Sequence, residues 1–213
     1  MAGKLEGAFP EISIQGGDLS AEGGIQIQVW DGEVSLKDFW GERMLSKRRR
    51  LGFEVNMRDL NMELVTQSFS FGQMGGVLEG EVKNLAFSFG QPESFDLQIR
   101  SVPRRGIKQY VDAKAVANLS ILSSGVQAPL LPWFKYYPYS KLGISCKLEN
   151  DVFTLRGTIV EGETEYLVKR GFLRGINVIN RNPDNRIPWK DMVQRIGRIV
   201  TPEGDKIRVE TGS

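Results

Sequence analysis

The alternation of apolar and polar side chains in residues 51–58 most constrains what this chain can fold into. Apolar residues stand at every second position, with polar residues or glycine between them. The apolar set is Leu51, Phe53, Val55 and Met57. Successive side chains of a β-strand point to opposite faces, so this period of two places the whole set on one face. The segment is therefore predicted to be a strand with one face buried.

The same period of two recurs along most of the chain. It is seen in residues 11–15, 25–29, 34–36, 77–82, 85–89, 95–99, 142–149 and 153–160. Glycine is abundant, with 24 of 213 residues, and pairs such as Gly16-Gly17 and Gly23-Gly24 separate these segments. Glycine readily adopts the positive φ that tight hairpin turns require. We expect a mainly β (α+β) fold, either a curved, highly twisted antiparallel sheet or an incomplete barrel or groove. Residues 1–213 would form a single β-groove domain.

Three segments favour helices instead. Residues 59–69 are predicted to form a short helix that Asp59 caps. Residues 107–122 are rich in small alanines, which favours a helix packed closely on the concave face of the sheet. In residues 188–200 the apolar side chains fall on one side of a helix that begins near Pro188. This amphipathic helix could pack on the sheet, or it could lie at a membrane interface through its apolar side.

Composition argues against several classes of function. The sequence has no histidine, which is the commonest general base and the commonest metal ligand in proteins, and only one cysteine, Cys146. Its net charge of +2 gives no sign of nucleic-acid binding. Glu161, Glu163 and Glu165 lie close together, but in a predicted hairpin turn where acidic residues favour solubility. We therefore expect a protein that is not an enzyme and that has no cofactor and no metal site.

Two further segments have an unusual composition. Residues 46–50 contain four consecutive basic residues. They form either a solvated loop or a contact with lipid head groups or an acidic partner. Residues 128–139 combine proline with aromatic residues, which suits either a plug at the end of the core or a lid over a groove. Candidate residues for contact with a partner or a membrane lie in this segment and in the C-terminal helix: Trp133, Phe134, Tyr137, Trp189, Met192 and Ile196.

Two stretches of the sequence are similar to a known family. The first begins with Asp59-Leu60 and continues after a gap as FGQMGGVLEG in residues 71–80, and the second is YSKLGISCKL in residues 139–148. Together with the strands that follow, they resemble the C-terminal regions of AsmA/TamB/YdbH-like envelope proteins of Gram-negative bacteria. In that family a hairpin with phenylalanine-glycine and then glycine-x-leucine-x-glycine follows a short aspartate-leucine helix.

The resemblance implies a function in lipid handling. Such proteins form a long curved sheet with an apolar trough in the periplasm, and they are implicated in phospholipid transport and outer-membrane biogenesis. This chain would then be a C-terminal fragment of a longer protein, anchored in the membrane only by segments outside it. The candidate residues for a groove that binds acyl chains are Phe53, Val55, Ile144, Leu148, Phe153 and Leu155. The alternative is that these residues form a closed core, filled by the helix of residues 107–122.

A second hypothesis gives the chain a structural role. As a docking domain it would cap a longer β-groove and bind another envelope protein. The C-terminal helix and the aromatic segment would then be the contact surfaces. A sealed groove together with exposed apolar surface at those two places would favour this alternative.

Overall fold

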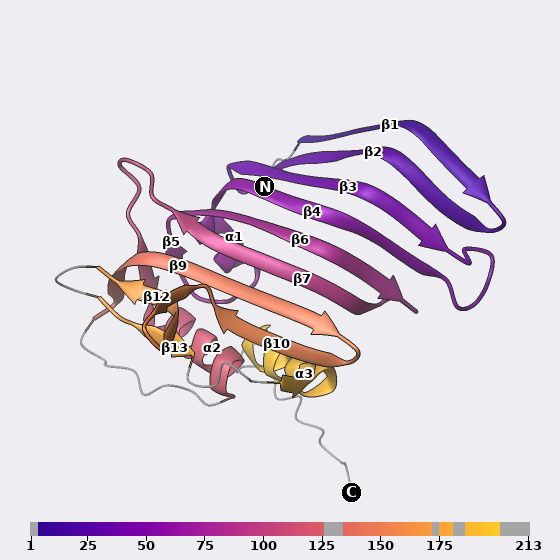
Figure 1. Cartoon of the computed structure of the whole chain (residues 1–213). Coiled ribbons are helices and arrows are strands. Elements are labelled where there is room, and N and C mark those ends of the chain that lie inside the picture. The colour runs from indigo at the N-terminus through magenta and orange to yellow at the C-terminus, as the bar shows by residue number, and fades with distance from the viewer. Residues whose placement is uncertain (1–3, 126–133, 172–174, 181–185, 201–213) are drawn as a thin grey trace, which may run out of the picture.

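A computed structural model describes residues 4–125, 134–171, 175–180 and 186–200. The strands in these ranges form one connected sheet in which every pairing is antiparallel. Its main path runs in the order β1 (Lys4–Gln15), β2 (Asp18–Val29), β3 (Gly32–Glu42), β4 (Arg50–Asn61), β6 (Val77–Ser88), β7 (Gln91–Val102), β9 (Tyr136–Glu149), β10 (Val152–Gly157) and β14 (Arg186–Pro188). The prediction of a large antiparallel sheet is confirmed (Figure 1).

Five short strands branch from this path. They are β5 (Met74–Gly75), β8 (Tyr110–Asp112), β11 (Ile159–Glu161), β12 (Thr164–Arg170) and β13 (Val178–Asn180). The long strand β9 joins them to the sheet, because its first half pairs with β8 and β12 and its second half with β7 and β10. The sheet does not close into a barrel, since β1 pairs only with β2.

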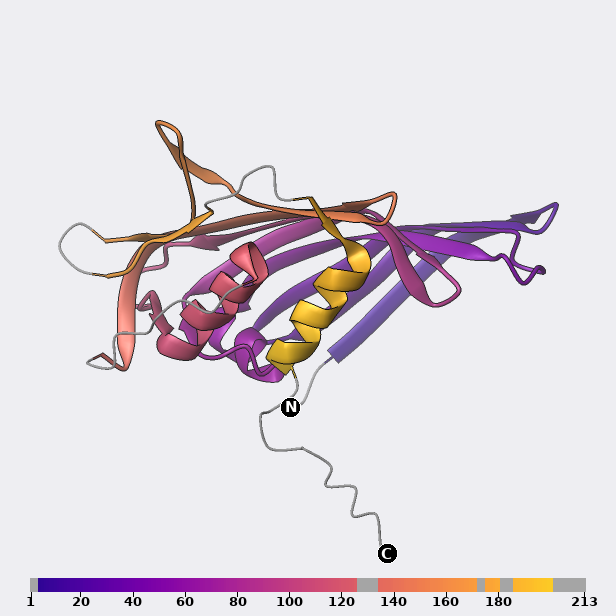
Figure 2. The ribbon, with the colours of Figure 1, turned by 90° about the horizontal axis from the view of Figure 1, so that it is seen from below.

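All three described helices lie on one side of the sheet. They are α1 (Met62–Ser68), α2 (Ala113–Ser124) and α3 (Trp189–Val200). Figure 2 shows α2 and α3 under the half of the sheet that contains β9 and β10. Helix α1 lies at the end of β4, where its residue Ser68 accepts a hydrogen bond of 3.0 Å from the indole N–H of Trp30. The buried core lies between these helices and that half of the sheet.

The predicted helix of residues 107–122 is present in shortened form as α2. It starts at Ala113, because residues Tyr110–Asp112 pair with β5 and β9 as strand β8. Asp112 then caps the helix, its side chain accepting a hydrogen bond of 2.7 Å from the backbone N–H of Ala115. The helix ends at Gly125, whose φ of 76° is the left-handed conformation common at helix C-termini.

The start predicted for the first helix is wrong by about three residues. Strand β4 continues to Asn61, and Asn61, not Asp59, caps α1 by accepting a hydrogen bond of 3.1 Å from the N–H of Glu63. Asp59 has a φ of 50° within the strand, where the register with β6 shifts. The boundaries of α3 agree with the sequence prediction, and its first residue follows Pro188.

The strand registers place apolar residues in continuous rows across one face of the sheet. Residues that pair directly across antiparallel strands share a face. One such row runs from β2 to β10 through Ile25, Leu36, Val55, Val82, Leu97, Cys146 and Leu155. The last two of these residues belong to the buried core, so the whole row lies on the face that carries the helices.

Candidate functional site

The apolar face is divided into a covered half and an open half. Four of the six predicted groove residues lie in the covered half, with side-chain exposures of 7% or less: Ile144, Leu148, Phe153 and Leu155. The ring of Trp189 in α3 packs 5.9 Å from that of Phe153 and 6.0 Å from that of Phe95. These four residues therefore form a closed core, as in the second of the two interpretations, and the groove prediction does not apply to them.

The other two predicted groove residues, Phe53 and Val55, lie in the open half. This half is formed by β1 to β4 and β6. The core cluster reaches these strands at one end, at Trp30, Val34, Met57, Leu60 and Leu78. We call its half-buried side chains the open floor: Ile25, Ile27, Leu36, Phe39, Phe53, Val55, Val82, Leu85 and Phe87. The apolar residues of the adjoining strand β1 are still more exposed, at 68% for Leu5, 57% for Ile12 and 69% for Ile14. No described helix covers this surface (Figure 2).

A row of phenylalanine rings crosses the open floor. The ring centroids lie 5.3 Å apart for Phe9 and Phe39, 5.5 Å for Phe39 and Phe53, and 6.0 Å for Phe53 and Phe87. These separations are in the range that aromatic pairs favour. The row links four strands of the open half, and it stabilises the floor without burying it.

Helix α3 packs against β7 and β10 in the covered half, where the ring of Trp189 contacts those of Phe95 and Phe153. Its buried residues Met192 and Ile199 pack toward the core, with exposures of 0% and 6%. Val193 and Ile196 lie on the same apolar side but are exposed to 48% and 38%. A cleft of about 740 Å³ lies beside the start of α3, and Pro92, Trp189 and Val193 contribute to its lining.

The predicted contact residues do not form one surface. Tyr137 and Met192 are buried in the core, with 7% and 0% exposure, so they are not available for contact with a partner. Phe134 and Ile196 are exposed to 62% and 38%, and the ring of Trp189 packs on the core. Trp133 lies outside the described residues. Of the three members of this set in α3, only Ile196 is exposed.

The outer face of the same strands carries charges. Lys37 and Glu54 form an ion pair of 3.4 Å across β3 and β4, and Arg100 and Glu79 form one of 3.0 Å across β7 and β6. Such exposed pairs contribute little to stability, but their charges keep this face hydrated. Lys37 and Glu54 thus lie on the opposite face of β3 and β4 from Leu36 and Val55 of the open floor.

The described residues contain no candidate metal site. No group of three or more acidic or cysteine side chains in the described ranges is placed to hold a metal. Two of the clustered glutamates have basic partners, Glu161 with Lys169 and Glu165 with Arg156. Burial raises the pKa of the Cys146 thiol to about 12, which keeps it protonated and unreactive at neutral pH. Among the described helices, none is long and apolar enough to span a bilayer.

Sequence reasoning missed most of the open floor. Ile25 and Leu36 alternate with polar residues as clearly as Phe53 and Val55 do. Phe39 breaks the alternation, because it follows Leu36 by three positions where the register with β4 shifts. Periodicity shows that each strand has an apolar face, but it does not show which strands the helices cover. Comparisons of the chain with family models, with curated proteins and with solved structures found no match, so the resemblance to AsmA/TamB/YdbH-like proteins stays a prediction.

Proposed function

We propose that the chain is a lipid-handling module of the bacterial cell envelope, in which phospholipid acyl chains lie on the open floor. The observation that carries this proposal is the row of aliphatic side chains that leaves the core and continues, uncovered, across β4, β3 and β2. Large apolar patches on a protein surface mark sites for apolar ligands or partners. The resemblance described above supports the envelope, on its periplasmic side, as the location.

The open floor suits acyl chains because their binding needs no specific polar group. Each methylene group that leaves water contributes about 0.8 kcal/mol. A saturated chain can therefore bind to aliphatic and phenylalanine side chains by burial alone, while its head group stays hydrated beyond the sheet. Such binding requires neither a catalytic residue nor a cofactor, and the proposal assigns no enzymatic activity to this chain.

Replacing two residues of the open floor by serine is expected to weaken acyl-chain binding by about tenfold or more. The double variant L36S/V55S places two hydroxyl groups in the middle of the aliphatic row, and the lost apolar contact accounts for the effect. The measurement is titration of the chain with a fluorescent long-chain fatty acid.

The matched control is the double variant K37S/E54S, which changes neighbouring positions of the same strands on the outer face. We expect the control to bind the probe as the unaltered chain does. Equal loss in both variants, or no binding of the probe by the unaltered chain, would contradict the proposal.

One observation favours the docking alternative. Strand β1 is twelve residues long and lies at the end of the sheet, with a neighbour only on the β2 side. The backbone groups of an edge strand can pair with a strand of another protein. A bulge between Ala8 and Glu11, where Pro10 lies, interrupts the edge without ending the strand. On this alternative, a strand of another envelope protein would pair with the free side of β1 and extend the sheet.

Photocrosslinking in cells separates the two functions. A benzophenone amino acid in place of Phe53 would be expected to form lipid adducts, because that ring lies on the open floor. The same amino acid in place of Ile12 would form few adducts with protein. Protein adducts at position 12 together with the absence of lipid adducts at position 53 would instead support the docking domain.

A further inference from the structure

Three hairpin turns meet at one edge of the sheet. Glu42 of β3 pairs with Arg50 of β4, Arg50 pairs with Ser88 of β6, and Ser88 pairs with Gln91 of β7. The turns after β3 and after β6 therefore lie at the same level, next to the turn between β1 and β2 (Figure 1). We call the turns of residues 43–49 and 89–90 the basic edge.

The first of these turns carries four positive charges and no negative charge. Its cations are Arg43, Lys47, Arg48 and Arg49, and all four side chains are exposed. Within the described part of the chain, no carboxylate forms an ion pair with any of them. Four exposed cations without an ion-pair partner among the described residues thus lie within one short segment.

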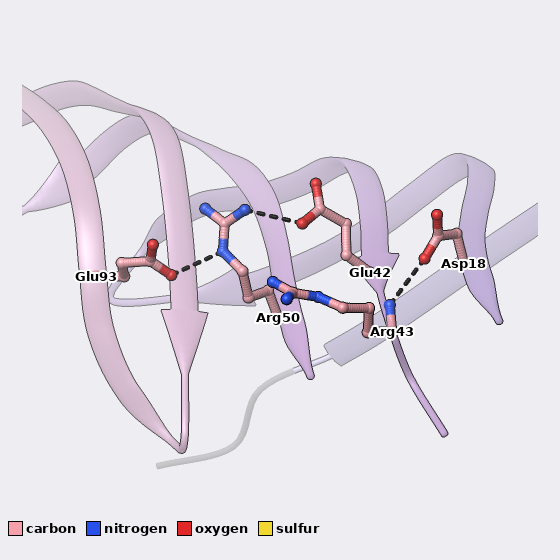
Figure 3. Close-up of polar contacts among 5 residues, drawn as sticks. All are labelled: Asp18, Glu42, Arg43, Arg50 and Glu93. Carbon is pink, nitrogen blue, oxygen red and sulfur yellow. Dashed lines mark hydrogen bonds and ion pairs between the residues drawn. The ribbon is translucent and has the colours of Figure 1, made fainter. Parts of the chain in front are cut away.

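Neighbouring contacts hold this turn in place and occupy the nearby carboxylates. The guanidinium of Arg50 donates a hydrogen bond of 2.8 Å to Glu42 and another of 2.8 Å to Glu93 (Figure 3). The backbone N–H of Arg43 donates to Asp18 at 2.8 Å. Arg50 therefore makes structural contacts within the fold, whereas the four cations of the turn are available to an external partner.

Two of the most exposed apolar side chains of the protein stand among these charges. Leu45, in the turn of residues 43–49, is exposed to 94%, and Phe89, in the turn of residues 89–90, is exposed to 72%. Cationic and apolar side chains that project together are typical of segments that bind at a lipid–water interface, where cations meet head groups and apolar tips enter the acyl region.

We propose that the basic edge docks on the surface of a bilayer that contains anionic phospholipid. We infer an anionic bilayer as the partner of the basic edge from charge complementarity, because unpaired cations match the phosphate groups of an anionic leaflet. The open floor begins close by, at Phe87 of β6, two residues before Phe89. The inference does not depend on the proposed function, since a bilayer can bind the turns whether or not an acyl chain enters the floor.

Vesicle flotation with the whole chain tests this proposal. We expect binding to vesicles of phosphatidylcholine with about a third of phosphatidylglycerol, and much weaker binding to phosphatidylcholine alone. Each basic side chain near an anionic surface strengthens binding by roughly fivefold. The triple variant K47Q/R48Q/R49Q should therefore lose on the order of a hundredfold in affinity, and the double variant L45S/F89S should also bind more weakly.

The matched control removes three exposed cations at the other edge of the sheet. The variant R105Q/K108Q/K141Q has the same net charge as the first triple variant, and we expect it to keep most of the binding. Equal loss in both triple variants would overturn the proposal in favour of non-specific attraction. Failure of the unaltered chain to bind anionic vesicles would also overturn it, while leaving the fatty-acid titration unaffected.

Discussion

Replacing Leu148 by alanine is expected to lower the free energy of unfolding by about 2–5 kcal/mol, the range for a buried leucine. Leu148 lies in β9 under the helices and is 1% exposed, so its loss leaves a cavity that the core cannot fill. Leu36 in β3 gives the matched comparison, because it lies on the same face of the sheet but in the open half. Leu36→Ala should cost about 1 kcal/mol or less, since its side chain already contacts solvent. Urea unfolding of both variants measures the difference.

This pair of variants tests whether the apolar face is really divided. If helices or other segments covered the whole face, the two substitutions would cost similar amounts. A large cost at Leu36 would therefore show that the open floor is buried in solution, and it would remove the basis for acyl-chain binding there. A small cost at both positions would show instead that the helices do not pack on the sheet as described.

Replacing Gly76 by alanine is expected to cost about 3 kcal/mol of stability. Gly76 has a φ of 134°, which residues with a side chain rarely adopt. A Cβ atom at this position would also lie 2.7 Å from the hydroxyl oxygen of Tyr139. That buried hydroxyl donates a hydrogen bond of 2.9 Å to the carbonyl of Gly75, and an alanine would displace it.

Gly90 provides the control for the second prediction. It also has a positive φ, 76°, but it lies in the turn between β6 and β7, with no atom within 4 Å of an added Cβ. Gly90→Ala should therefore cost only the backbone strain, about 1 kcal/mol. Thermal unfolding of both variants gives the comparison. Equal costs would show that the contact with Tyr139 is unimportant and that φ alone explains the need for glycine.

Several features of the fold could be predicted from short-range patterns in the sequence. The alternation in residues 51–58 predicts a strand and also which of its side chains share a face, because the period of a strand is two residues. The stop at Gly125 and the apolar side of α3 follow from local chemistry in the same way. Where prediction failed, a tertiary contact decided the outcome. Helix α2 starts later than predicted because Tyr110–Asp112 pair with two strands. The cap of α1 is Asn61 because β4 continues to pair with β6 up to that residue.

The sequence by itself determined that nearly every strand of this protein has one carbon-rich and one polar face. Only the tertiary structure decided that α2 and α3 cover that face at Leu148 and Phe153 but leave it open at Phe53 and Leu36. The physical reason is that periodicity reports how side chains are distributed about a single strand. The position of a helix on a sheet depends instead on contacts between residues far apart in the chain, such as Trp189 with Phe95.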